Sequence, residues 1–169
     1  GFSESGWLTQ DAHHAVRAVA LDSITPNQRH EAQSAALDAA AALGIGMVHE
    51  IGGPGISDAR DFGELMEPSR HPDAPQIVGY WGEKGGPAAA LALHARGAAG
   101  DLFIDGAIGS RTALLRQPYE GSVDVGAQYL TAAEVRDHAA ACSMAGVQAG
   151  FHASGDRTMD VPCAGLREA

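Results

Sequence analysis

Short apolar segments alternate with longer helix-like segments along most of this sequence, and this alternation restricts the fold more than any other feature. Each apolar segment is bounded by glycine or polar residues, as is typical of strands in a parallel sheet. Consecutive parallel strands require a crossover between them, and such crossovers are right-handed. The pattern therefore predicts an α/β fold with parallel strands over residues 45–51, 76–82, 101–105 and 147–152, the first of which we expect to be a buried strand.

The segments between these strands carry signals for helices. Thr25 and Gln28 have the spacing of a capping box before an Ala-rich run that ends at Gly44, and Thr131 and Glu134 repeat this spacing further on. Further helices are predicted over residues 57–66, 87–96 and from about 160 onward. The last of these requires Pro162 to lie in its first turn, where a missing N–H is tolerated.

Two parallel architectures are compatible with four βα units: an open doubly wound sheet and part of a (β/α)₈ barrel. The stretch GGPGISDA after the first strand lacks the GxGxxG spacing of a dinucleotide site, and GGPG is too little for the phosphate loop of a flavodoxin-like domain. A complete barrel has about 250 residues. We therefore expect a partial TIM barrel over residues 25–169, with residues 1–24 as a lead-in.

Composition restricts the partners. The net charge is −10 and there is no basic run, so we expect no nucleic-acid partner. No apolar run approaches the roughly 20 residues of a membrane-spanning helix, and no signal peptide is visible. Cys142 and Cys163 stand singly, without the spacing of a zinc ligand pair, so we expect a reducing, cytoplasmic environment.

Polar residues recur at the ends of the predicted strands, where parallel barrels carry their chemistry. His49, Asp105 and His152 end three of the strands, and Asp156 follows closely. Each also has a structural interpretation: a lone histidine is more often hydrogen-bonded than a metal ligand, Asp105 begins a turn dipeptide, and Asp156 is suited to cap a helix. Arg111, in the long segment 106–128, is suited either to binding a substrate carboxylate or to solvation on a surface loop.

Two stretches carry a resemblance to a known family. DGAIGSRTALLRQPY, residues 105–119, and HASGDR, residues 152–157, resemble signatures of the YtcJ-like amidohydrolases (amidohydrolase family 3) of the metal-dependent amidohydrolase superfamily. TPNQRHEAQSAALDAAAALGIGMVHEIGG, residues 25–53, is similar to the family's helix and strand that end in a VHD-type motif. The resemblance covers essentially the whole chain in the family's order.

This resemblance implies a barrel hydrolase with one or two divalent ions, most simply zinc, whose bound water attacks an amide-like carbon–nitrogen bond. It assigns His152 as a metal ligand at the end of the fifth barrel strand. Asp101 stands where the family often has a carboxylated lysine, so Asp101 is a possible second metal ligand. Asp105, Arg111 and His49 correspond to the family's active-site mouth, and these three residues and Asp156 are expected to bind substrate. No catalytic acid or base is assigned.

The resemblance also implies that the chain is a fragment that spans about strands two to five, with residues 1–24 from an inserted region before them. The family's first-strand HxH motif and its sixth- and eighth-strand ligands have no counterpart here. One hypothesis is thus part of a metal-dependent hydrolase of small-molecule substrates, inactive alone. The other is a non-catalytic half-barrel that associates through its open edges, for example as a homo-oligomer.

Overall fold

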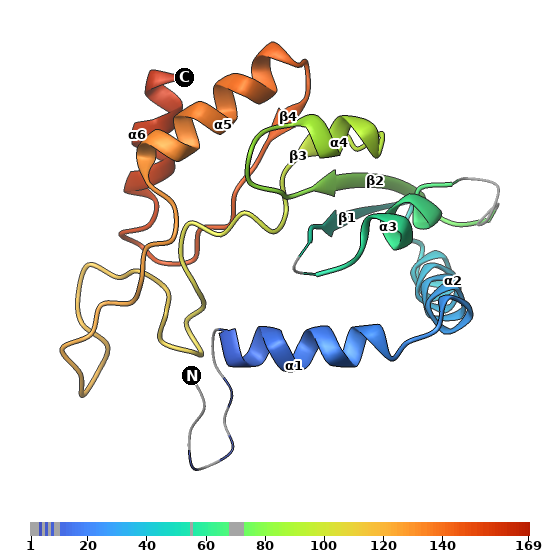
Figure 1. Cartoon of the computed structure of the whole chain (residues 1–169), viewed down its shortest axis with the longest axis horizontal. Coiled ribbons are helices and arrows are strands. Elements are labelled where there is room, and N and C mark those ends of the chain that lie inside the picture. Colours follow the sequence, from blue (N-terminus) through green and yellow to red (C-terminus); the bar gives the residue numbers. More distant parts are fainter. Residues whose placement is uncertain (1–3, 5, 7, 9–10, 55, 68–72) are drawn as a thin grey trace. The chain divides into compact units, whose positions relative to one another are not determined.

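The computed structural model describes residues 4, 6, 8, 11–54, 56–67 and 73–169. These residues form two compact units, Gly1–Glu50 with Pro54–Val78 (unit 1) and Ile51–Gly53 with Gly79–Ala169 (unit 2). From α2 onward, helices and strands alternate along the chain (Figure 1). The elements are α1 (Asp11–Asp22), α2 (Pro26–Ala42), β1 (Met47–Gly52), α3 (Ala59–Leu65), β2 (Gln76–Trp81), α4 (Ala88–Ala92), β3 (Gly97–Ala98), α5 (Ala132–Met144), β4 (Gln148–Ala149) and α6 (Asp160–Glu168).

The four strands form one sheet in the order β1-β2-β3-β4, which confirms the predicted α/β fold with successive parallel strands. β2 pairs in parallel with β3 through Tyr80 and Gly97, and β3 pairs in parallel with β4. Sequential neighbours in a parallel sheet are the arrangement expected for consecutive units of a barrel. Among the residues that the structure describes, no helix is both long and apolar enough to cross a membrane.

In unit 1, α2 begins with the predicted capping box. The Gln28 side chain accepts a hydrogen bond from the Thr25 backbone N–H at 2.9 Å, and Thr25 Oγ1 accepts one from the Gln28 N–H at 3.3 Å. The side chain of Arg29, one residue later, donates to the carbonyl of Leu21 and to the carboxylates of Asp58 and Asp61. We call these four residues the Arg29 cluster, because they join α1, α2 and the N-terminus of α3.

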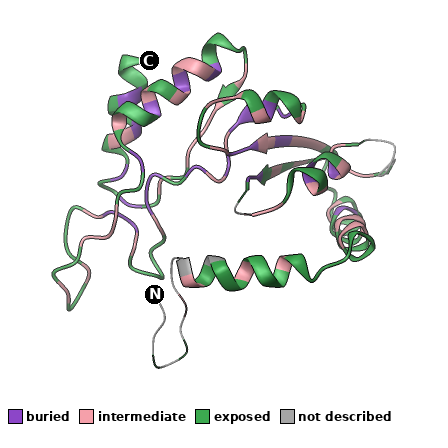
Figure 2. Cartoon of the chain, viewed as in Figure 1, coloured by how far each residue is buried: buried purple, intermediate pink, exposed green. Residues whose placement is uncertain are grey.

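The prediction that the first strand is buried on both faces is wrong. Exposed and half-buried positions alternate along β1, and Met47, His49 and Ile51 share the exposed face (Figure 2). Successive side chains of a strand point to opposite faces, so this alternation means that one face of β1 is covered and the other is not. An apolar composition alone cannot distinguish this case from a fully covered parallel strand.

The prediction of a third strand over residues 101–105 is wrong in position. Regular pairing occurs earlier, at Gly97–Ala98, directly after the predicted helix 87–96. Gly100 has φ +114°, which breaks the strand, and the chain then resumes sheet-like bonding as an isolated parallel bridge between Phe103 and His152. The fourth strand is shortened in the same way to Gln148–Ala149, with His152 in the bridge.

The core of unit 2 is built between the sheet and the C-terminal helices. Leu102, Ile104, Leu130 and Val135 are buried together, and Phe151 and Val161 pack against them. The predicted capping box at Thr131 and Glu134 is present at the start of α5. α6 begins at Asp160, which places Pro162 in the first turn as predicted.

Candidate functional site

His152 is fixed through its backbone and exposed through its side chain. Its N–H donates to the Leu102 carbonyl and its carbonyl accepts from the Ile104 N–H, both at 2.9 Å. Its ring stacks on the ring of Phe103, with centroids 4.7 Å apart and 13° between the planes. Phe103 is itself 39% exposed. The residue predicted as a metal ligand is therefore an accessible imidazole held against the segment 101–105.

Asp101 lies where the ends of several strands meet within unit 2. The space beside it is so restricted that a Cβ added at Gly53, just after β1, would lie 2.5 Å from the Asp101 Cβ and 2.6 Å from the Gly82 carbonyl oxygen. Only glycine allows this approach. Asp101 is half-buried, as a carboxylate at the end of a parallel sheet is expected to be.

Asp105 is completely buried, with 0% of its surface exposed. Its carboxylate accepts hydrogen bonds from three backbone N–H groups and one hydroxyl. The donors are Leu114 N at 2.8 Å, Ser154 N at 2.9 Å, Gly155 N at 2.8 Å and Thr158 Oγ1. We call this set of five residues the Asp105 clamp. With no exposed surface, Asp105 acts in this structure on the protein backbone, and its predicted contact with substrate stays a prediction.

Two opposing effects determine the pKa of Asp105. Burial favours the neutral acid, whereas the hydrogen bonds from Thr158, Ser154, Leu114 and Gly155 favour the carboxylate. The hydrogen bonds together outweigh burial, so the pKa of Asp105 lies below its ordinary value. The Asp105 clamp therefore contains a charged carboxylate at neutral pH.

Arg111 is exposed at the tip of a tight loop. Its φ is +56°, in the left-handed region that residues with side chains rarely adopt. The loop is closed by hydrogen bonds from Arg111 N to the Ile108 carbonyl and from Ala107 N to Thr112 Oγ1, both at 3.0 Å. Uncommon backbone conformations of this kind cluster at functional sites, so the geometry is compatible with the predicted role of Arg111 in binding substrate.

Asp156 lies on the surface beside the same loops. Its Oδ1 accepts hydrogen bonds from Arg116 N at 3.0 Å and from Arg157 N at 2.9 Å. The alternative that Asp156 caps the following helix is wrong, because the N-cap of α6 is Met159, which makes no side-chain cap. Asp156 instead connects the loop after β4 to the long segment that contains Arg111.

His49 and Glu50 belong to unit 1 and are described apart from the residues above. His49 lies on the exposed face of β1. Glu50 points to the other, half-buried face, where burial raises the pKa of its carboxyl group. The predicted role of His49 in substrate binding stays a prediction.

The described residues do not form a complete metal site. Nowhere in residues 11–54, 56–67 and 73–169 do three His, Cys, Asp or Glu side chains converge closely enough to hold an ion. A zinc site needs about three or four protein ligands. His152 fits one ligand position, since its imidazole is exposed and its backbone is fixed, but the described residues do not complete the set of ligands around it.

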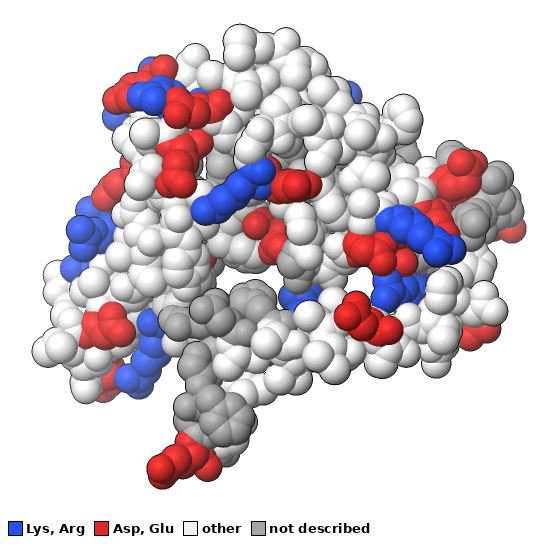
Figure 3. All heavy atoms as spheres, in the orientation of Figure 1, with Lys and Arg blue, Asp and Glu red and all other residues white. Residues whose placement is uncertain are grey.

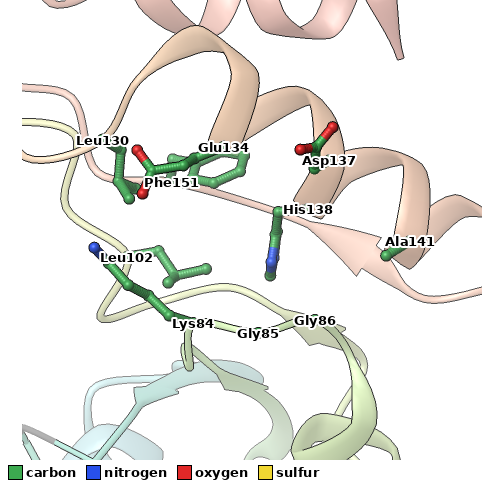
Figure 4. A pocket seen from close by; sticks show the side chains of 10 residues that line it. All are labelled: Lys84, Gly85, Gly86, Leu102, Leu130, Glu134, Asp137, His138, Ala141 and Phe151. Atoms are coloured by element: carbon green, nitrogen blue, oxygen red, sulfur yellow. The ribbon is translucent and has the colours of Figure 1, made fainter.

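A pocket of about 340 Å³ lies elsewhere in unit 2, beneath α5 (Figure 4). Its lining is largely apolar, with Glu134, Asp137, His138 and Lys84 as its charged or titratable side chains. His138 Nε2 lies 2.9 Å from the Ala98 carbonyl oxygen, so this nitrogen carries the proton. None of the six predicted site residues lines the pocket, but two of its lining residues are their neighbours in sequence: Leu102 follows Asp101, and Phe151 precedes His152.

Sequence reasoning missed Thr158 and Gly155 as site residues. Thr158 is completely buried and donates to Asp105, and a Cβ at Gly155 would overlap the Leu114 carbonyl. Thr158 directly follows the HASGDR signature that contains Gly155, but no local pattern indicates which distant carboxylate they contact. That contact spans 53 residues for Thr158.

The parallel sheet with polar groups at its strand ends defines a barrel-type α/β chain, and comparison with protein families agrees. The amidohydrolase family model (Amidohydro_3) matches residues 4–168, so the chain belongs to the amidohydrolase family. No curated protein matches the chain.

Two solved structures share the fold. An uncharacterized metal-dependent hydrolase from Pyrococcus furiosus superposes with a TM-score of 0.72 at 22% identity, over 99% of this chain and 37% of that one. A second, from Pyrococcus horikoshii OT3, has a TM-score of 0.72 at 20% identity, over 98% of this chain and 36% of that one. The present chain thus spans little more than a third of the length of these structures.

Proposed function

We propose that this chain forms part of a metal-dependent hydrolase that cleaves carbon–nitrogen bonds in small amide-like or cyclic amide substrates. The observation that carries the proposal is His152: an exposed imidazole, fixed by backbone pairing with Leu102 and Ile104, at the end of a parallel strand in an amidohydrolase-family chain. The specific resemblance to YtcJ-like enzymes, and to their barrel strands two to five, is part of this proposal.

In this proposal His152 supplies one ligand to a divalent ion and Asp101 supplies a second. The remaining ligands come from parts of the protein outside these residues. We favour zinc, because neutral imidazole and carboxylate are suitable zinc ligands. Such an ion lowers the pKa of its bound water and so supplies a nucleophile at neutral pH.

Arg111 and His49 are the side chains that we assign to substrate binding. The Arg111 guanidinium is exposed and suited to a carboxylate, which it can bind through two parallel hydrogen bonds. Acidic and basic side chains are interspersed on the face shown in Figure 3, which favours a small-molecule substrate over nucleic acid. Both cysteines are free, and we propose a cytoplasmic location on that basis.

The test is His152→Ala in a full-length protein that carries this segment. We expect loss of the bound ion, measured by elemental analysis after dialysis, together with a loss of amide hydrolysis of at least about 100-fold. His94→Asn is the matched control, because His94 is also exposed and asparagine tolerates its φ of +54°. Full metal content and activity in the His152→Ala protein would reject the proposal.

The second candidate is the non-catalytic half-barrel that associates with another copy. Exposed large apolar side chains favour it, among them Met47 and Ile51 of β1 and Phe103. Size-exclusion chromatography with and without chelator distinguishes the candidates. A dimer that forms without metal and has no hydrolytic activity would support association, whereas a metal-dependent active species supports the hydrolase.

A further inference from the structure

Asp105 is a buried carboxylate that has no cationic partner among the described residues, which is an unfavourable environment for a charged group. All four hydrogen bonds to Asp105 come from uncharged donors, three backbone N–H groups and the Thr158 hydroxyl. Removing an ionised carboxylate from water is strongly unfavourable unless its oxygens are fully hydrogen-bonded. An aspartate whose only role is to begin an Asp-Gly turn does not need to be buried among four hydrogen-bond donors. The identity of Asp105 therefore calls for an explanation beyond its place in an Asp-Gly turn.

We propose that Asp105 is a positioning residue that holds the segment after Arg111 against the segment after His152. Its Oδ2 accepts from Leu114 N on the first segment and from Gly155 N on the second, while Oδ1 accepts from Ser154 N. The functional consequence rests on the proposed function, because it treats His152 and Arg111 as site residues. The connection that Asp105 makes between the two segments does not depend on the proposed function.

The two segments are packed so closely that they cannot shift independently. A Cβ at Gly155 would collide with the carbonyl of Leu114, and the N–H of the same Leu114 donates a hydrogen bond to Asp105. A second connection lies at the surface, where Arg116 N donates to Asp156. The two loops are in backbone contact, and the buried Asp105 carboxylate binds both of them. We therefore expect them to move as one rigid body.

His152 is thus fixed from both directions along the chain. Its own N–H and carbonyl pair with Leu102 and Ile104, and Ser154, two residues later, is bound to Asp105. Fixing the backbone on both sides restricts the direction in which the imidazole leaves the sheet. The stacking of His152 on Phe103 is the visible result of this restriction.

The first test uses this chain and needs neither metal nor substrate. Asp105→Asn replaces one carboxylate oxygen by an NH₂ group that faces an N–H donor, so at least one clamp bond is lost. We expect the ring-current shift that Phe103 imposes on the His152 proton signals to collapse, and the amide exchange of Ser154 and Gly155 to accelerate at least about tenfold. Asp124→Asn is the control, since Asp124 is exposed and its carboxylate accepts a hydrogen bond from the nearby Gly126 N–H.

A paired substitution covers the case in which Asp105→Asn fails to fold. Thr158→Val removes one clamp hydroxyl at nearly constant volume, and Thr158→Ser retains it. We expect the valine variant to reduce the His152 ring-current shift and the serine variant to preserve it. Equal effects of the two substitutions, or a folded Asp105→Asn chain with an unchanged His152 signal, would overturn the positioning role.

The second test addresses function in a full-length protein and uses zinc as the probe. If Asp105 positions His152, Asp105→Asn weakens zinc binding about 10- to 100-fold, whereas Asp124→Asn leaves it unchanged. If Asp105→Asn abolishes the ring-current shift of His152 but leaves zinc affinity unchanged, Asp105 does position His152, but His152 is not a zinc ligand. Unchanged signals together with unchanged affinity would refute the positioning role itself.

Discussion

The Arg29 cluster of unit 1 and the Asp105 clamp of unit 2 both connect separate segments of the chain, but they do so through side chains of opposite charge. In each, one charged side chain joins segments that are distant in sequence through several hydrogen bonds. Arg29 meets two carboxylates and remains 21% exposed, whereas Asp105 meets only neutral donors and is fully buried. The first depends on charge pairing near solvent and the second on complete hydrogen bonding away from it.

This difference determines what each site contributes. Pairs of charges near solvent are screened by water and salt and contribute little to stability. A buried acceptor whose removal leaves several donors unsatisfied contributes much more. We therefore expect the two sites to differ in the size of the mutational effect, in pH dependence and in salt dependence.

The largest expected effect is that of Asp105→Ala, which removes the acceptor from three backbone N–H groups and the Thr158 hydroxyl. The desolvation cost of buried unsatisfied donors predicts a fall of about 3 kcal/mol in the free energy of unfolding. Urea unfolding followed by circular dichroism measures it. Asp124→Ala, at an exposed carboxylate, serves as control, and an equally small effect of both substitutions would contradict the assigned role of the buried site.

The next effect is acid destabilisation of unit 2. Because the folded pKa of Asp105 lies below its unfolded value, the carboxylate contributes stability that is fully present above the ordinary Asp pKa of about 3.9 and is lost as pH falls through the lower folded value. We expect amides of Leu114 and Gly155 to lose exchange protection in that range. The same amides in Asp105→Asn have no such titration, and an unchanged acid profile in that variant would contradict the prediction.

The sequence predicted the elements whose signals are local. The capping boxes at Thr25 and Thr131 and the start of α6 near Asp160 involve residues a few positions apart, and all are present. The third strand was misplaced because Gly100 interrupts it and the pairing of Phe103 with His152 depends on a contact 49 residues away.

The candidate site shows the same limit. Family signatures identified Asp105 and His152 as neighbours in function, but the spacing of residues does not distinguish a buried acceptor from an exposed ligand. The structure makes this distinction through the donors from Ser154, Gly155 and Thr158, which reach Asp105 only after the chain folds. Local patterns therefore predict elements better than they predict the roles of polar residues between them.

The smallest expected effect is that of Arg29→Met in unit 1, which keeps the apolar stem and removes the charge. Hydrogen bonding to Asp61 is the largest cause of the raised pKa of Arg29, and the backbone N–H of Asp61 is the largest cause of the lowered pKa of Asp58. Asp58 therefore keeps its main stabilising contact as the N-cap of α3 when Arg29 is lost. We expect a smaller fall in stability than for Asp105→Ala.

Salt dependence distinguishes the two sites most directly. The effect of Arg29→Met on amide exchange in α3 should shrink in about 0.5 M NaCl, where screening acts over only a few ångströms, because the pairs with Asp58 and Asp61 lie near solvent. Arg60→Met is the control, since Arg60 is 70% exposed and pairs with Glu64 within α3. If the effect of Arg29→Met is large and insensitive to salt, the Arg29 cluster stabilises the fold in the same way as the buried Asp105 clamp. The reason is that salt does not screen contacts that are removed from water.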